Sequence, residues 1–155
     1  MEQRLTWADL LIDPPSTGMA EILAPWRAIL NGKFRPIAFS AFGNLFFERP
    51  DGSVHVLDVI DGEVTGVAPS FTSFQTLVNT REWQEEHLAS ELIWQLRQRG
   101  LRPGVNECYA ISPHPVFGAG ITPDRIMPMS IQVWLSLSAQ AHGFPAVSSS
   151  APSAV

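Results

Sequence analysis

The sequence of 155 residues contains a single cysteine, Cys108, and a single lysine, Lys33. One cysteine excludes a disulfide framework within the chain and a cysteine-rich zinc site. Ten basic residues stand against fifteen acidic ones, which gives a formal net charge of −5. Direct nucleic-acid binding requires a basic surface, so this charge disfavours that function. The charge fits a basic protein partner better, because opposite charges accelerate encounter.

Long apolar runs are also missing. No window approaches the ~18 consecutive apolar residues of a membrane-spanning helix. The first residues, MEQRLTWADLL, lack the basic segment and continuous apolar stretch of a signal peptide. We therefore expect a soluble cytoplasmic protein with no membrane partner.

The apolar residues that are present suffice for one core. Hydrophobic residues make up 45% of the chain, and this length suits one domain better than two. Thr6 is placed to cap a short helix over residues 7–12, which two prolines end. A second helix is predicted over residues 19–30, where Pro25 interrupts the pattern and Gly32 follows its end.

Four short segments in the next part of the chain have the composition of strands. They cover residues 34–42, 44–49, 53–60 and 63–68. The PDGS sequence at 50–53 and the Asp61-Gly62 pair are tight-turn signals between them, because proline sets φ and glycine accepts a positive φ. We predict an antiparallel meander of three or four strands between residues 34 and 68.

The second half of the sequence is predicted to be mainly helical. Ser70 is suited to begin one helix, and either Asn79 or Thr80 is suited to begin another. The second of these, over residues 81–99, is the longest helical pattern and is stopped by Gly100.

The C-terminal part completes an α+β prediction. We expect a further strand near residues 107–112 and a last helix over 129–142, whose β-branched first residues also allow a strand. The apolar spacing of that helix places four residues in the core: Ile131, Trp134, Leu135 and Ser138. Strands and helices that are segregated along the chain are typical of α+β folds. We predict one α+β domain over residues 1–143, built on an antiparallel meander with packed helices, and a disordered tail over 144–155.

The stretch ECYAISPHPVFGAGI, residues 107–121, holds the residues most suggestive of catalysis. Cys108 and His114 are a candidate nucleophile and base, but no nucleophile motif surrounds the cysteine, and a cysteine in an apolar strand usually serves packing. Gly118-Ala119-Gly120 lacks the third glycine and the lysine of phosphate-binding loops, so a turn is favoured. The four histidines have no metal-ligand spacing. We therefore expect no catalytic residue, cofactor or metal.

Two groups of residues are candidates for a binding surface. Five carboxylates fall within the predicted hairpins: Glu48, Asp51, Asp58, Asp61 and Glu63. They are either solvated turn residues or an acidic face for a basic cleft. Helical spacing also aligns a stripe on the predicted 81–99 helix: Trp83, His87, Ser90, Trp94 and Arg97. Exposed tryptophan beside arginine is typical of binding hot spots, unless another element covers the tryptophans.

Four motifs along the chain are informative in combination: FGNLFF at 42–47, PDGSVHVLD at 50–58, GLRPGVNECY at 100–109 and HPVFGAG at 114–120. Together they resemble a bacterial immunity family, the immunity domain paired with DNase effectors of the type VI secretion system. The resemblance extends from about Leu5 to Gly143. The chain departs from the family at Gly118-Ala119-Gly120, where a glycine pair is common. It also leaves no room for the extra N-terminal domain, similar to a piece of a tRNA-synthetase insertion, that some relatives carry.

The resemblance implies a non-enzymatic protein that binds a cognate secreted toxin, a basic nuclease, and protects the producing cell. The alternatives are a small enzyme or ligand-binding domain that uses the Cys108/His114 loop, and a housekeeping interaction module. The sequence does not address the oligomeric state. The candidate toxin-binding residues are the five hairpin carboxylates, four residues of the helical stripe and two residues expected at a loop tip: Glu48, Asp51, Asp58, Asp61, Glu63, Trp83, His87, Trp94, Arg97, His114 and Phe117.

Overall fold

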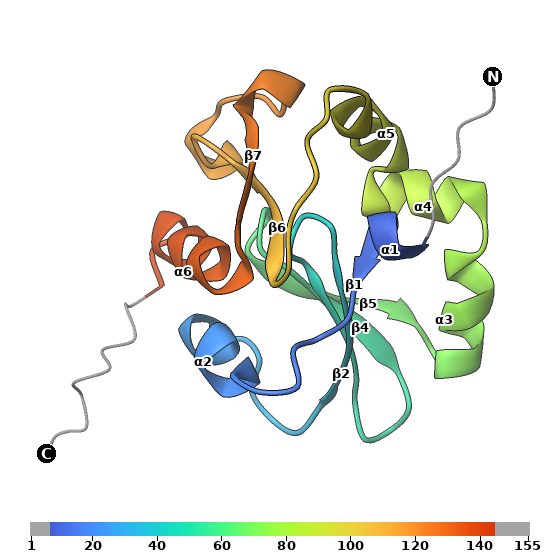
Figure 1. Ribbon diagram of the computed structural model, residues 1–155. Coiled ribbons are helices and arrows are strands. Elements are labelled where there is room, and N and C mark those ends of the chain that lie inside the picture. The colour runs from blue at the N-terminus through green and yellow to red at the C-terminus, as the bar shows by residue number, and fades with distance from the viewer. Residues whose placement is uncertain (1–6, 145–155) are drawn as a thin grey trace, which may run out of the picture.

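The computed structural model describes residues 7–144 and shows an α+β fold with two antiparallel sheets (Figure 1). The predicted cap at Thr6 and the predicted tail from residue 145 onward lie outside the described residues. The helices are α1 (Trp7–Leu10), α2 (Met19–Leu23), α3 (Phe71–Val78), α4 (Arg81–Leu88), α5 (Ser90–Gln98) and α6 (Ile131–Ala141). Within this part of the chain no helix is both long and apolar enough to cross a membrane.

The larger sheet has five strands in sequence order, all antiparallel. Its strands are β1 (Leu11–Ile12), β2 (Arg35–Ser40), β3 (Leu45–Glu48), β4 (Val54–Asp58) and β5 (Glu63–Ala68). The meander predicted between residues 34 and 68 is therefore confirmed as four strands. The helix predicted over 7–12 ends early, at Leu10, because Leu11 and Ile12 pair with Ser40 and Phe39 at the sheet edge.

Helices cover both faces of this sheet, with α2 and α6 on one side and α3 and α4 on the other (Figure 1). Side chains alternate between the two faces of a strand. Phe46 of β3 contacts Phe74 and Trp83 of the α3–α4 layer, while its neighbour Phe47 stacks on His55 of β4. Because both faces are covered, the consecutive residues Leu45, Phe46 and Phe47 are all buried.

The second sheet pairs β6 (Glu107–Ile111) with β7 (Ile126–Ser130) and confirms the strand predicted near 107–112. The backbone amide of Tyr109 donates to the carbonyl of Ala41, which joins β6 to the larger sheet. The indole Nε1 of Trp134 on α6 donates to the carbonyl of Phe42 at 2.8 Å. Trp26 Nε1 donates in the same way to Leu135 at 2.9 Å. Two buried indoles thus fix α6 against the rest of the core.

Two predicted helices are shorter than their sequence patterns. The pattern over 19–30 forms a helix only to Leu23, and a 3₁₀ turn with Pro25 in its first positions follows. The predicted 81–99 helix is wrong as a single element, because Ala89 adopts φ 53° and ψ 49° and separates α4 from α5. The Glu85 carboxylate accepts hydrogen bonds from Ser90 Oγ and Glu91 N, so it caps the new helix start.

The end of the described chain also differs from prediction. Phe144, assigned to the tail, packs edge-on against Trp26 with ring centroids 5.1 Å apart. Its amide donates to the carbonyl of Ala139 at 3.0 Å. The folded domain therefore includes residue 144. By contrast, the predicted core face of α6 is confirmed, with Ile131, Trp134 and Leu135 all buried.

Candidate functional site

The five hairpin carboxylates do not form one acidic face. Glu48 and Asp51 lie at the β3–β4 turn, whereas Asp58, Asp61 and Glu63 lie at the β4–β5 turn. Strand β4 separates the two turns, and a strand rises ~3.3 Å per residue. Of the two alternatives, a single acidic face made by all five carboxylates is thus wrong, because successive turns of a meander lie at opposite ends of the sheet.

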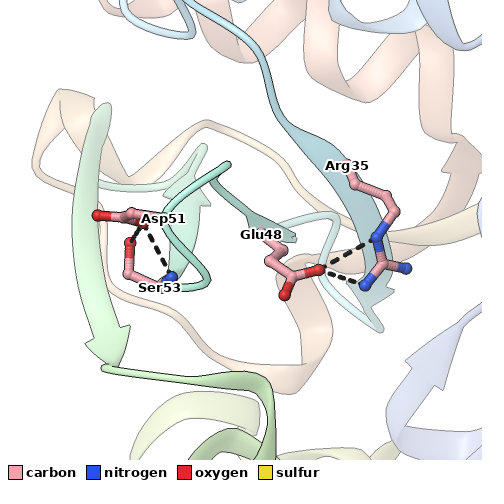
Figure 2. A network of polar contacts seen from close by, with 4 residues as sticks. All are labelled: Arg35, Glu48, Asp51 and Ser53. Atoms are coloured by element: carbon pink, nitrogen blue, oxygen red, sulfur yellow. Dashed lines mark hydrogen bonds and ion pairs between the residues drawn. The ribbon is translucent and has the colours of Figure 1, made fainter.

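At the β3–β4 end the carboxylates are matched within the chain (Figure 2). Glu48 forms an ion pair with Arg35 on the neighbouring strand β2. Asp51 accepts hydrogen bonds from the backbone amide of Ser53 at 3.0 Å and from its hydroxyl at 2.6 Å. These hydrogen bonds lower the pKa of Asp51. Both carboxylates therefore make contacts within the sheet and its turn.

At the β4–β5 end the structure has a groove of about 290 Å³ between the 58–61 turn and the end of α4. Three carboxylates line it, those of Asp58, Asp61 and Glu86, together with the imidazole of His87. No lysine or arginine is among its lining residues, and Ile121 contributes an apolar rim. We call this feature the acidic groove.

Asp58 builds the turn that carries the groove. Its Oδ1 accepts hydrogen bonds from the amides of Ile60 and Asp61, both at 2.9 Å. Burial is the main cause that raises the pKa of Asp58. Asn44 supports the same turn, because its Oδ1 accepts from the amide of Val59 at 2.9 Å. Asp61 and Glu63 are exposed, so they are the carboxylates of this turn that a partner can reach.

The helical part of the groove is built on an aromatic cluster. The sequence leaves open whether Trp83 is an exposed binding residue or is covered by another element, and the structure shows it covered, with only 6% of it exposed. Its ring packs 5.6 Å from that of Phe46 and 5.7 Å from that of Phe74, so it belongs to the core. His87 lies against Trp83, with ring centroids 4.6 Å apart, and reaches the groove from there.

The remaining residues of the predicted stripe do not join this site, because the break at Ala89 redirects α5. Arg97 Nη1 forms an ion pair with Asp9 Oδ2 at 2.7 Å, which ties α5 to α1. Arg97 lines a different cleft, of about 700 Å³. Ser90 donates to Glu85, and Trp94 is half-buried on α5. The structure brings together only His87 from the stripe with Asp58 and Asp61 from the hairpin.

The Cys108/His114 pair lacks the features of a nucleophile and its base. Cys108 is fully buried, and this burial, with the nearby Glu107 charge, raises the pKa of its thiol to about 12. A protonated thiol is a poor nucleophile at neutral pH. Both ring nitrogens of His114 are engaged by backbone, since Nδ1 accepts from Val116 N at 3.1 Å and Nε2 donates to the Val59 carbonyl at 3.2 Å.

His114 also corrects the expectation that it lies at a solvent-facing loop tip. Its ring is 7% exposed and stacks on Trp134 at 5.2 Å. Burial lowers its pKa. His142, at the end of α6, donates from Nε2 to the carbonyls of Val59 and Ile60 at 3.1 and 3.0 Å. The two histidines therefore brace the 58–62 turn from the β6–β7 loop and from α6.

The rest of the 107–121 stretch forms a shaped loop. Gly118 has φ 93° and ends the 3₁₀ turn Pro115–Phe117, as predicted for a turn glycine. Phe117 is 69% exposed. Within residues 7–144 no cluster of three or more histidine, cysteine or acidic side chains is arranged to hold a metal ion.

Three contributors to this region were missed from sequence. Glu86 and Ile121 line the acidic groove, and His142 braces its turn. Glu86 precedes the predicted stripe residue His87 in the sequence, and this adjacency was the only local indication that Glu86 belongs to the site. Ile121 and His142 approach the turn only through tertiary packing, and no local pattern marks them.

Comparison with known proteins supports the fold. No family model matches the chain, and a search of curated proteins also finds no match. A solved structure, that of Atu4351 from Agrobacterium tumefaciens, is similar with a TM-score of 0.54 and 17% sequence identity. The similarity covers 78% of this chain and 63% of that one, so the chain spans less than two thirds of the length of Atu4351.

Proposed function

We propose that this protein is an immunity protein that binds a cognate secreted toxin, a basic nuclease, and neutralises it in the cytoplasm of the producing cell. The observation that carries this proposal is the acidic groove, which gathers Asp58, Asp61 and Glu86 with no lysine or arginine in its lining. The motif resemblance to immunity domains agrees with such a role. The buried, protonated Cys108 gives no support to the alternative of a cysteine-dependent enzyme.

The chemistry of the groove suits a basic side chain. Nucleases bind phosphates through arginine and lysine, and a carboxylate can take the place of a phosphate oxygen opposite those groups. Asp61 and Glu86 supply the charge, with Glu86 Oε2 lying 3.8 Å from His87 Nε2, and exposed Ile121 supplies apolar surface for the methylene stem of the entering residue. Exposed Glu63 at the start of β5 extends the negative field and favours rapid association.

The test is co-expression with a secreted nuclease toxin encoded beside this chain's gene. We expect the chain to restore growth of cells that produce the toxin, and to co-purify with a catalytically inactive form of it. The purified chain should also inhibit DNA cleavage at a fixed molar ratio. A chain that neither rescues growth nor co-purifies with that toxin contradicts the proposal.

A matched pair of variants locates the contact. Asp61→Asn with Glu86→Gln removes two charges from the groove with little change in shape, and we expect weaker co-purification. Glu48→Gln with Asp51→Asn removes the same number of charges from the other turn and should leave co-purification intact.

A further inference from the structure

The exposed apolar side chains of this protein are unevenly distributed. Within residues 7–144, seven large apolar residues are exposed, and six of them belong to the β6–β7 loop, β7 or α6. Only Val105 lies elsewhere. Five of the six form what we call the apolar patch: Val116, Phe117, Met127, Val133 and Leu137. Ile121, the sixth, already lines the acidic groove.

Two residues of the patch line a hollow. Phe117 of the loop and Leu137 of α6 line a cavity of about 330 Å³, together with Trp134 and Met129. Val133 lies one helical turn from Leu137 on the same face of α6. Met127 is two residues from Met129 on β7, so both side chains point to the same side of the strand. Three separate elements thus direct apolar groups toward one opening.

The loop that presents Phe117 is held in place (Figure 1, the loop between β6 and β7). The Phe117 amide donates to the His114 carbonyl at 3.0 Å, and the Gly118 amide donates to the Pro115 carbonyl at 2.9 Å. Farther along, Arg125 Nη1 donates to the Gly120 carbonyl at 3.0 Å. An exposed aromatic ring on a braced loop loses little conformational entropy on binding, which is the property of an interface anchor.

The patch and the acidic groove share the β6–β7 loop. The same loop carries Phe117 into the hollow and Ile121 to the rim of the groove. His114 lines the hollow and bonds through Nε2 to Val59, in the turn that ends at Asp61. A single partner segment can therefore occupy both.

We propose that the apolar patch is the second half of the toxin interface and takes a large apolar side chain of the toxin. That side chain lies next to the lysine or arginine of the toxin that enters the acidic groove. The inference rests on the proposed function. Charge complementarity selects this occupant over a second copy of the chain, because a symmetric dimer would bring two acidic grooves and two net charges of −5 together.

The test measures the affinity of the purified chain for the catalytically inactive toxin by calorimetry. We expect Phe117→Ala and Leu137→Ala each to weaken binding at least tenfold. Val105→Ala is the matched control, since Val105 is 92% exposed on the segment before β6 and away from the patch, and it should bind within twofold of wild type. Thermal unfolding of Phe117→Ala should match wild type, because the ring lies mostly in solvent.

The outcomes separate the two proposals. If the wild-type chain does not bind the toxin, the proposed function itself fails. If the wild type binds and both patch variants bind within twofold of it, the function stands and this inference is overturned. A wild-type dimer in light scattering that Phe117→Ala converts to a monomer also overturns it, because the patch is then a self-association surface.

Discussion

The two ends of the β-meander carry carboxylates in different settings. At the β3–β4 turn, Glu48 pairs with Arg35, and Asp51 accepts two hydrogen bonds from Ser53 (Figure 2). At the β4–β5 turn, Asp61 is exposed at a groove whose lining contains no lysine or arginine. The two carboxylates of the first turn are thus matched by neighbours within the chain, whereas Asp61 at the second turn faces a groove without lysine or arginine.

This difference shows that the effect of a carboxylate depends on the cationic groups around it. An exposed ion pair such as Glu48–Arg35 contributes ~0–1 kcal/mol to folding and leaves little field for a ligand. Carboxylates without cationic neighbours contribute little to folding but attract a basic partner. The comparison predicts that perturbing the first turn affects stability modestly, while perturbing the second affects both stability and binding.

The largest expected effect comes from the glycines of the two turns. Gly62 has φ 76°, and a Cβ there would lie 2.6 Å from His142 Nδ1. The His142 ring is held by the Val59 and Ile60 carbonyls, so it cannot move freely. We expect Gly62→Ala to lower the free energy of unfolding by about 3 kcal/mol or more, through backbone strain and overpacking.

Gly52 is the matched control at the other turn. Its φ is 91°, but a Cβ there would meet no atom within 4 Å. Gly52→Ala should therefore cost only the backbone term, about 1–2 kcal/mol. Urea unfolding of both variants measures the difference, and equal losses would show that the His142 brace does not constrain the turn.

The next effect is on binding and uses charge reversal at the two ends. We expect Asp61→Lys with Glu63→Lys to weaken toxin binding at least tenfold, or about 1.4 kcal/mol. The reversal of Glu48 and Asp51 to lysine should change affinity less than twofold in 0.15 M salt, because β4 separates the two turns by more than the Debye length of ~8 Å. Calorimetry with the inactive toxin tests both, and a larger loss at the Glu48 end would move the interface there.

The smallest effect is the pH dependence of the braced turn. Burial lowers the pKa of His114 in the folded protein, so the unfolded chain takes up a proton at higher pH than the folded chain does. Stability is full above pH ~6.5, the ordinary histidine value, and declines as the pH falls from there. We expect urea unfolding between pH 7.5 and 5.5 to show this decline, with a shallower slope in His114→Gln.

A slope unchanged in His114→Gln would assign the pH dependence to other groups. Asp58 contributes with the opposite sign. Its raised pKa makes the folded state bind a proton more readily than the unfolded chain, so it opposes the decline from His114, and the comparison with His114→Gln isolates the histidine.

Most of the fold was predictable because its signals are local. Glycine turns delimit the meander strands, and Ser70 and Thr80 cap α3 and α4 through their side chains, as the sequence indicated. The break at Ala89 was not predictable in this way. It carries neither glycine nor proline, and it depends on the Glu85 carboxylate reaching forward to Ser90 and Glu91. Strand β1 likewise forms only through long-range pairing with β2.

The candidate site was predictable only in part. The acidic character of the hairpins was visible in the sequence, and the intervening strand β4 already implied two separate groups of carboxylates. The burial of Trp83 follows from contacts with Phe46 and Phe74, which no local pattern reveals. The inward position of His114 depends on Trp134 and the Val59 carbonyl, both distant in sequence.

The single cysteine of this protein can report local opening of the structure through its chemical labelling. Cys108 Sγ is sealed beneath Gly43 and the α6 layer, and a thiol reagent gains access only when β6 opens. The rate of labelling under native conditions therefore measures how readily β6 opens. Since β6 leads directly into the loop that carries Phe117, slower labelling in the presence of a partner would report engagement of that face in the wild-type chain, with no introduced probe.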